Sequence, residues 1–104
     1  MSDVVDSTDN PIEIEDPFAR RLVDKYLQRR RDDIGMLMIA AQSADFETVR
    51  VTGHNLYGSG AAYGLADISS IGAKLESAAK AADAPKIERL INDLRDFLSN
   101  LKVC

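Results

Sequence analysis

The sequence predicts an all-α fold, an up-down antiparallel four-helix bundle with one additional short N-terminal helix packed against it. Apolar residues recur at steps of three and four along five consecutive segments, which is the spacing of one face of a helix. No segment shows the strict alternation of apolar and polar residues that is typical of a half-buried strand. Because the connections between the segments are short, neighbouring helices should run antiparallel.

The composition predicts one domain and limits the classes of partner. At 104 residues the chain can bury a single core. The stretch 1–15 is rich in Asp, Ser and Thr, which predicts a flexible acidic arm before a helical domain over 16–104. A net charge of −4 without a sustained basic block argues against nucleic acid and anionic membranes as main partners. No signal peptide or membrane span is evident, and the single cysteine, Cys104, allows no internal disulfide, so we expect a cytoplasmic protein.

The first two predicted helices divide near the middle of the segment 17–43. Asp16-Pro17 is a start signal, because Asp accepts backbone N–H bonds at an N-cap and Pro lacks the N–H that would go unpaired. The first helix should run to about residue 30. Asp32 or Asp33 could then cap a second helix that ends near residue 43 or 44. The apolar residues are Phe18, Leu22 and Tyr26 in the first helix and Ile34, Leu37, Met38 and Ala41 in the second.

Three further helices follow. Asp45 should cap the third, since Thr48 stands three residues on and an apolar stripe then continues to Tyr63. Gly64 would end this helix in the left-handed conformation that glycine tolerates. The fourth helix should span about 65–83, and the fifth should open at Ala84-Pro85 and run through residue 101.

The third helix carries the only histidine of the chain, His54, among several glycines. At about 100° per residue His54 lies roughly 140° from the centre of the apolar stripe, so it should face solvent. Helical side chains lean toward the N-terminus, so the residue that would overhang the imidazole is Gly58, which has no side chain. An open imidazole near neutral pH can act as a base, a metal ligand or a nucleophile.

The residues alone leave several roles open for this histidine. A metal site is disfavoured, because His54 has no second histidine, useful cysteine or suitably spaced carboxylate beside it. Hydrolytic catalysis is disfavoured because Ser59 points to another side of the helix. An incidental surface histidine stays possible, since the glycines could serve close helix packing. Gly53 and Gly60 do lie on the core stripe, whereas Gly58 does not.

The stretch His54-Asn55-Leu56-Tyr57-Gly58-Ser59, with Gly64 ten residues after the histidine, resembles the signature of histidine-containing phosphotransfer (HPt) domains. The pattern of that family is His-x-Leu-Lys-Gly-Ser with a later glycine. The flanking stretches Ala44-Asp45-Phe46 and Ala73-Lys74-Leu75-Glu76 fit it as well, and the resemblance covers about residues 17–102.

The resemblance implies a four-helix bundle and a phosphoacceptor role for His54. The histidine would take a phosphoryl group from an aspartyl phosphate on a response-regulator receiver domain, or from a hybrid histidine kinase, and pass it on. Such a chain is a monomeric carrier rather than an enzyme, without a cofactor or metal of its own, and the magnesium comes with the receiver. The residues expected to contact the partner are Arg50, Val51, Tyr57, Gly58, Ser59, Ala61 and Ala62.

One position departs from the family pattern. The usual lysine three residues after the histidine is Tyr57 here, which can donate a hydrogen bond but brings no charge. Arg50, one turn before the histidine, or Lys74 on the next helix could supply the missing charge, and the sequence does not choose between them. The departure also favours an alternative, an adaptor that binds a receiver or kinase and carries no phosphate. A helical adaptor unrelated to phosphorelays is a further alternative, but it leaves the pairing of His54 with Gly58 unexplained.

Overall fold

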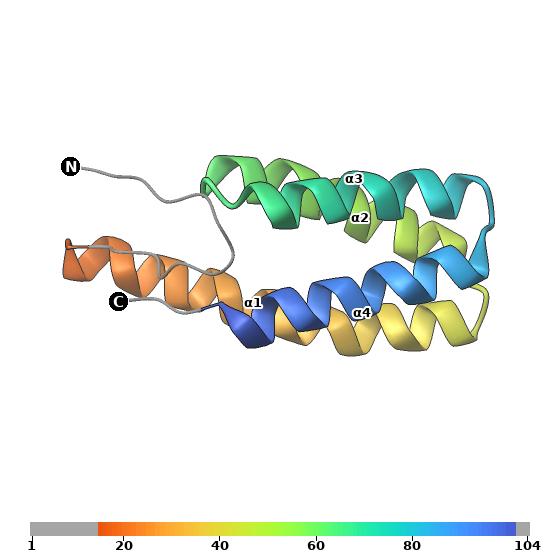
Figure 1. Ribbon diagram of the computed structural model, residues 1–104, viewed down its shortest axis with the longest axis horizontal. Helices are drawn as coiled ribbons and strands as arrows, with labels where there is room; N and C mark the ends of the chain where they lie inside the picture. The colour runs from red at the N-terminus through yellow and green to blue at the C-terminus, as the bar shows by residue number, and fades with distance from the viewer. Residues whose placement is uncertain (1–14, 102–104) are drawn as a thin grey trace.

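The computed structural model describes residues 15–101, and within them it forms four helices and no strand. The helices are α1 (Pro17–Gln42), α2 (Phe46–Ala62), α3 (Ala66–Lys80) and α4 (Ala84–Asn100), which run alternately up and down along one long axis (Figure 1). This confirms the predicted all-α class. The predicted acidic arm, apart from its last residue, and Cys104 lie outside the described residues.

The break predicted within 17–43 is wrong, because α1 is one continuous helix of 26 residues. The two aspartates that suggested a cap pair with residues one turn earlier in the same helix. Asp32 accepts a hydrogen bond from Gln28 at 3.2 Å, and Asp33 forms an ion pair with Arg30 at 2.9 Å. Pairs at this spacing support a helix rather than end it. The expected additional N-terminal helix is therefore the first part of α1, and it is not a separate element.

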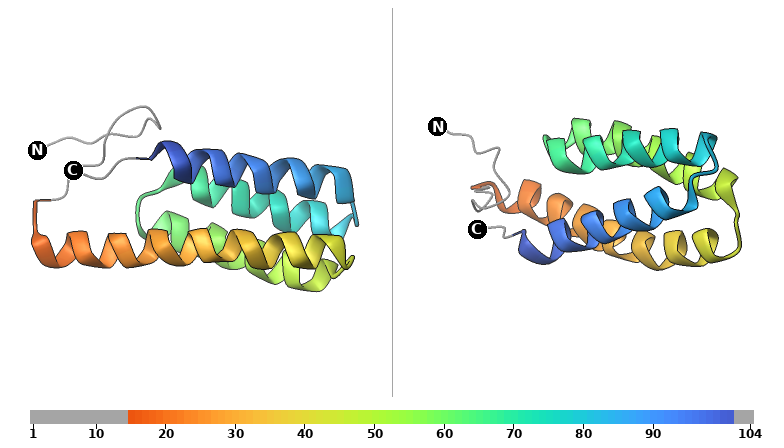
Figure 2. Two further views of the ribbon diagram at one scale, coloured as in Figure 1. Left: turned by 90° about the horizontal axis from the view of Figure 1, so that it is seen from below. Right: turned by 45° about the vertical axis from the view of Figure 1, so that its right-hand side comes forward.

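Each helix packs against the next in chain order, and α4 closes the bundle against α1. The views agree that the first turns of α1 extend beyond the ends of the other three helices (Figure 2). The core lies along the bundle axis, and each fully buried aliphatic side chain there stabilises the fold by about 1.5–3 kcal/mol. Its largest fully buried members are Leu37, Val49, Leu56, Ile68, Leu75, Ile87 and Leu94.

The turns between helices use left-handed backbone at one residue each. Asp45 caps α2 as predicted, since its carboxylate accepts hydrogen bonds from the backbone N–H and the hydroxyl of Thr48 at 3.2 and 2.6 Å. Gly64 has φ +72° after α2, which confirms the predicted glycine turn. Ala44 and Ala82 hold the same conformation with φ 55° and 54°, although an L residue is strained there.

Glycines bring α2 and α3 into close contact. A Cβ on Gly60 would lie 2.5 Å from the backbone nitrogen of Ser69, and a Cβ on Gly72 would lie 2.5 Å from the backbone nitrogen of Tyr57. Gly53 faces the α3 backbone at a similarly short distance. No larger residue fits at these three positions without moving a helix. The crossing therefore sets which residues of α3 stand beside the middle of α2.

Candidate functional site

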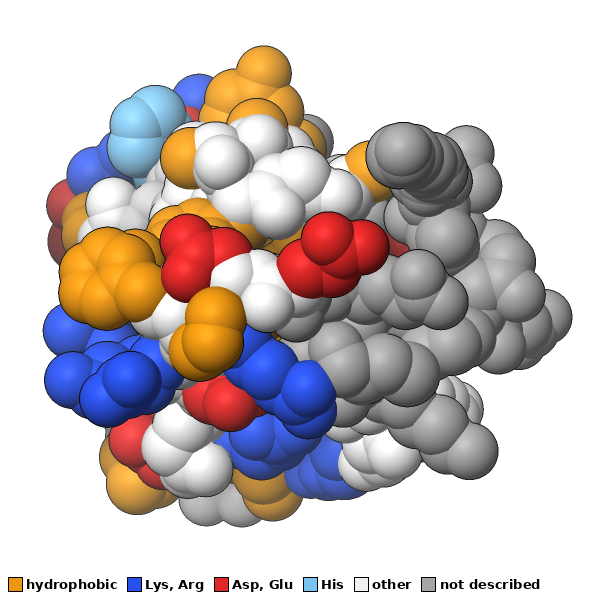
Figure 3. Space-filling model, turned by 90° about the vertical axis from the view of Figure 1, so that its left-hand side faces the viewer, with side chains coloured by type: hydrophobic (Ala, Val, Ile, Leu, Met, Phe, Trp, Pro, Cys, Tyr) orange, Lys and Arg blue, Asp and Glu red, His pale blue; other side chains and the backbone are white. Residues whose placement is uncertain are grey.

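His54 projects from the middle of α2 into solvent, as predicted, and 64% of its side chain is exposed. Figure 3 shows the histidine in pale blue at the rim of one end view, with basic side chains close to it. The side chain is therefore accessible to a macromolecular partner without any movement of the helices.

One carboxylate stands beside the imidazole. Both carboxylate oxygens of Glu76, on α3, lie 3.4 Å from Nδ1 of His54, a long and weak contact. A neutral imidazole that keeps its proton on Nδ1, facing this carboxylate, leaves the Nε2 lone pair free. The other nitrogen is then available to attack an electrophile.

The contact between Glu76 and His54 was not anticipated from the sequence. The two residues are 22 positions apart, and their meeting depends on the register of α2 against α3. A signal was nonetheless present in Gly72. Glu76 follows that glycine by one turn, so it had to lie near the same α2-facing side of α3.

Gly58 has open space where a side chain would stand. A Cβ built there meets nothing within 4 Å, in contrast to the glycines at the crossing with α3. Close packing thus accounts for Gly53 and Gly60 and does not account for Gly58, as expected. The structure therefore leaves the approach to the imidazole bare on the side where a side chain at this position would lean.

Other residues expected to contact a partner share the exposed side of α2. Val51 is 42% exposed and Tyr57 is 51% exposed, and Ala61 and Ala62 are also exposed. With His54 and Gly58 they form what we call the His54 face. Small and apolar side chains around one reactive group are typical of a surface for a transient partner.

Ser59 is directed toward α1 and is not brought to His54. Its hydroxyl lies 2.8 Å from the Tyr26 hydroxyl and accepts a hydrogen bond from Arg30 at 3.1 Å. The Tyr26 ring in turn stacks on the Tyr63 ring, with 4.2 Å between ring centroids. The Arg30 guanidinium lies over the Tyr26 ring. In this structure Ser59 joins α2 to α1.

The two cations considered in the sequence are differently placed. Arg50 donates two hydrogen bonds to Glu47, at 3.0 and 2.6 Å, and this carboxylate raises the pKa of Arg50, with a smaller contribution from Glu76. Lys74 lines a hollow between α3 and α4 together with Asp93 and Asp96, among other residues. Lys74 is thus on a side of α3 different from the one that faces His54.

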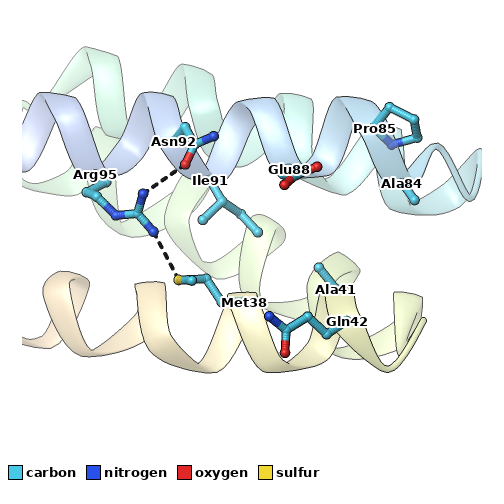
Figure 4. A pocket seen from close by; sticks show the side chains of 9 residues that line it. All are labelled: Met38, Ala41, Gln42, Ala84, Pro85, Glu88, Ile91, Asn92 and Arg95. Atoms are coloured by element: carbon cyan, nitrogen blue, oxygen red, sulfur yellow. Dashed lines mark hydrogen bonds between the residues drawn. The ribbon is translucent and has the colours of Figure 1, made fainter.

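A hollow with a volume of about 550 Å³ lies between α1 and α4. Figure 4 shows Arg95 at one end, where it donates hydrogen bonds to Asn92 at 2.9 Å and to the Met38 sulfur at 3.0 Å. No residue of α2 or α3 lines it, so it is separate from the His54 face. Within residues 15–101 no group of three or more His, Cys, Asp or Glu side chains could hold a metal ion.

Comparisons with known proteins bear on most of the chain. A family model described as Hpt domain matches residues 21–103. No curated protein and no solved structure matches the chain at a significant level. Among the described helices, none is long and apolar enough to cross a membrane.

Proposed function

The chain belongs to the Hpt domain family, whose members serve histidine phosphotransfer in phosphorelays, and on this premise we propose that His54 carries the phosphoryl group. The observation that carries this proposal is the combination of an exposed imidazole, a carboxylate at its Nδ1 and an unhindered Gly58. The donor we propose is the aspartyl phosphate of a receiver domain, and a second receiver or a hybrid kinase completes the relay.

The proposed transfer uses the lone pair on Nε2. This nitrogen attacks phosphorus in line with the bond to the aspartate oxygen, so a nitrogen–phosphorus bond forms while that phosphorus–oxygen bond breaks. The aspartate carboxylate leaves with the electron pair. The imidazole ring then carries positive charge, and the Glu76 carboxylate near Nδ1–H stabilises it. Attack by the next receiver's aspartate on the phosphorus reverses these changes.

On this proposal the protein is a carrier without its own kinase or hydrolase machinery. The receiver brings the magnesium and acidic residues that complete the site, so the chain needs only to present the imidazole on an accessible face. A monomer in the cytoplasm meets this requirement. The exposed, mostly small and apolar His54 face supports docking of a partner domain around the imidazole.

The proposal is tested by incubating the protein with a phosphorylated receiver and measuring its intact mass. We expect an increase of one phosphoryl group that is lost in acid and kept in base, and none in His54→Gln. The variant should melt at nearly the same temperature, because exposed substitutions usually change stability by about 0.5 kcal/mol or less. Labelling that persists in His54→Gln would place the acceptor elsewhere.

Tyr57 favours one alternative, an adaptor of the same family that binds a receiver or kinase without carrying phosphate. Tight binding of a phosphorylated receiver with no change in mass would support the adaptor and overturn the carrier. Membership of the family speaks against an adaptor unrelated to phosphorelays.

A further inference from the structure

A phosphoryl group on His54 would bring negative charge close to the carboxylate of Glu76. Both carboxylate oxygens lie 3.4 Å from the imidazole Nδ1, and the Glu76 side chain is only 20% exposed. Like charges at such short range repel, and partial burial of the carboxylate weakens the screening by water. A phosphoacceptor histidine in this position therefore needs a compensating cation, which Tyr57 does not supply.

Lys80 forms an ion pair with this carboxylate. It is the last residue of α3, one turn after Glu76, and its Nζ lies 3.7 Å from Oε2 of Glu76, one of the two carboxylate oxygens near His54. The side chain is 62% exposed, so its long aliphatic stem is free to move. The ammonium group can thus turn from the carboxylate toward a group bound on the imidazole without disturbing the core.

The other basic residues considered for this role are less suited to it. Arg50 is held by two hydrogen bonds to Glu47, so its charge is largely compensated within α2. Lys74 stands among aspartates in the hollow between α3 and α4.

We propose that Lys80, held near the imidazole by Glu76, is the positioning residue that supplies positive charge to the phosphoryl group on His54. In the free protein the ammonium neutralises Glu76. During transfer it moves toward the phosphoryl oxygens, and the carboxylate faces the charged imidazole ring. The charge that the family usually places one turn after the histidine thus comes from the neighbouring helix. This inference rests on the proposed function.

The test compares Lys80→Gln with the matched control Lys74→Gln, which removes a lysine from the same helix on another side. Transfer from a phosphorylated receiver is measured at saturating receiver, so that docking affinity does not enter. We expect Lys80→Gln to slow transfer about three- to tenfold at low salt, with a difference that shrinks as salt is added. Lys74→Gln should transfer at the native rate, and Lys80→Arg should restore most of it.

A second variant separates a charge effect from a structural one. In the double variant Tyr57→Lys with Lys80→Gln, a lysine returns to the usual family position, and we expect transfer to recover. Equal rates for the native protein and Lys80→Gln at every salt concentration would overturn the role of Lys80. Equal losses in Lys80→Gln and Lys74→Gln would overturn it as well. If the native protein takes no phosphoryl group at all, the proposed function fails instead, so the two failures are distinguishable.

Discussion

At the residue scale, the site depends on a difference between two glycines of one helix. Gly60 is enclosed by the backbone of α3, whereas Gly58 faces open space beside His54. Bare backbone at Gly58 costs helix stability of about 1 kcal/mol relative to alanine, and nothing in the packing offsets it. The open approach to the imidazole is the physical reason that the structure offers for this glycine.

Gly58→Glu should therefore stabilise the protein and block phosphotransfer. Glutamate has the higher helix propensity, so we expect a gain of about 0.5–1 kcal/mol in urea unfolding. The new side chain leans over the imidazole and brings negative charge toward the incoming phosphoryl group. Gly58→Ala is the control, with a similar gain in stability and most of the transfer rate kept. Native transfer by Gly58→Glu would show that the bare turn has no role.

The exposed orientation of His54 and the bare turn at Gly58 could be predicted from the sequence, because both follow from the local geometry of one helix. Glu76 and Lys80 could not be assigned to the site in this way. Glu76 lies beside His54, and Lys80 lies beside Glu76. The first of these contacts depends on how closely α2 and α3 approach and in which register, which is set by contacts between residues distant in the chain.

At the element scale, helix ends were easier to predict than helix continuity. Asp45 and Gly64 have one structural meaning in their context, since one accepts N–H bonds and the other adopts positive φ. Asp32 and Asp33 allow two structural interpretations, because an aspartate after basic residues suits either an N-cap or an ion pair within a helix. In α1 both aspartates pair with residues one turn earlier, and the helix continues through them. The pattern of residue types does not reveal which interpretation holds.

The stability lost when the N-cap of α2 is removed should depend on pH. The side-chain and backbone hydrogen bonds from Thr48 lower the pKa of Asp45, so its stabilising effect is present above the ordinary aspartate pKa of about 3.9 and is lost as pH falls through the lower folded value. Asp45→Ala should therefore lower the urea midpoint at pH 7 and lower it less at pH 3. An equal loss at both pH values would contradict the contribution of the charged cap.

Replacing Ala82 by glycine should relieve backbone strain in the turn between α3 and α4 and so stabilise the protein. Ala82 is exposed and has φ 54°, a conformation that costs an L residue about 1–2 kcal/mol and costs glycine little. The greater freedom of glycine in the unfolded chain offsets part of the relieved strain. We therefore expect Ala82→Gly to raise the free energy of unfolding in urea by about 0.5 kcal/mol. Ala81→Gly, at a residue with φ −87°, is the control and should destabilise. A loss in both variants would refute the strain.

The crossing of α2 and α3 predicts opposite effects for one kind of substitution. Helix propensity alone favours alanine at Gly60 by about 1 kcal/mol. A Cβ there would lie 2.5 Å from the backbone of Ser69, however, and such overpacking typically costs about 1–3 kcal/mol. Gly60→Ala should thus destabilise where Gly58→Ala stabilises, as thermal unfolding of the two variants can show. A gain in both would mean that the crossing is loose.

At the scale of the whole molecule, the four helices divide into two pairs with separate surfaces. The α2–α3 pair presents His54, Glu76 and Lys80, and the α1–α4 pair lines the large hollow on other faces of the bundle. Local openings follow the density of packing. Amide hydrogen exchange should accordingly be slowest in the crossing of α2 with α3 and fastest in the first turns of α1, which extend beyond the bundle. Uniform exchange along α1 and α2 would contradict this division.

Under the proposed function, the close crossing of α2 and α3 also bears on the direction of phosphoryl transfer. Helices held backbone to backbone leave the His54 face little room to change shape. Under the proposed function, a donor and an acceptor would therefore meet the same surface. Such a carrier has no conformational change that would favour phosphoryl transfer in one direction over the other. Phosphoryl groups would then be transferred in either direction, depending on the concentrations and phosphorylation states of its partners.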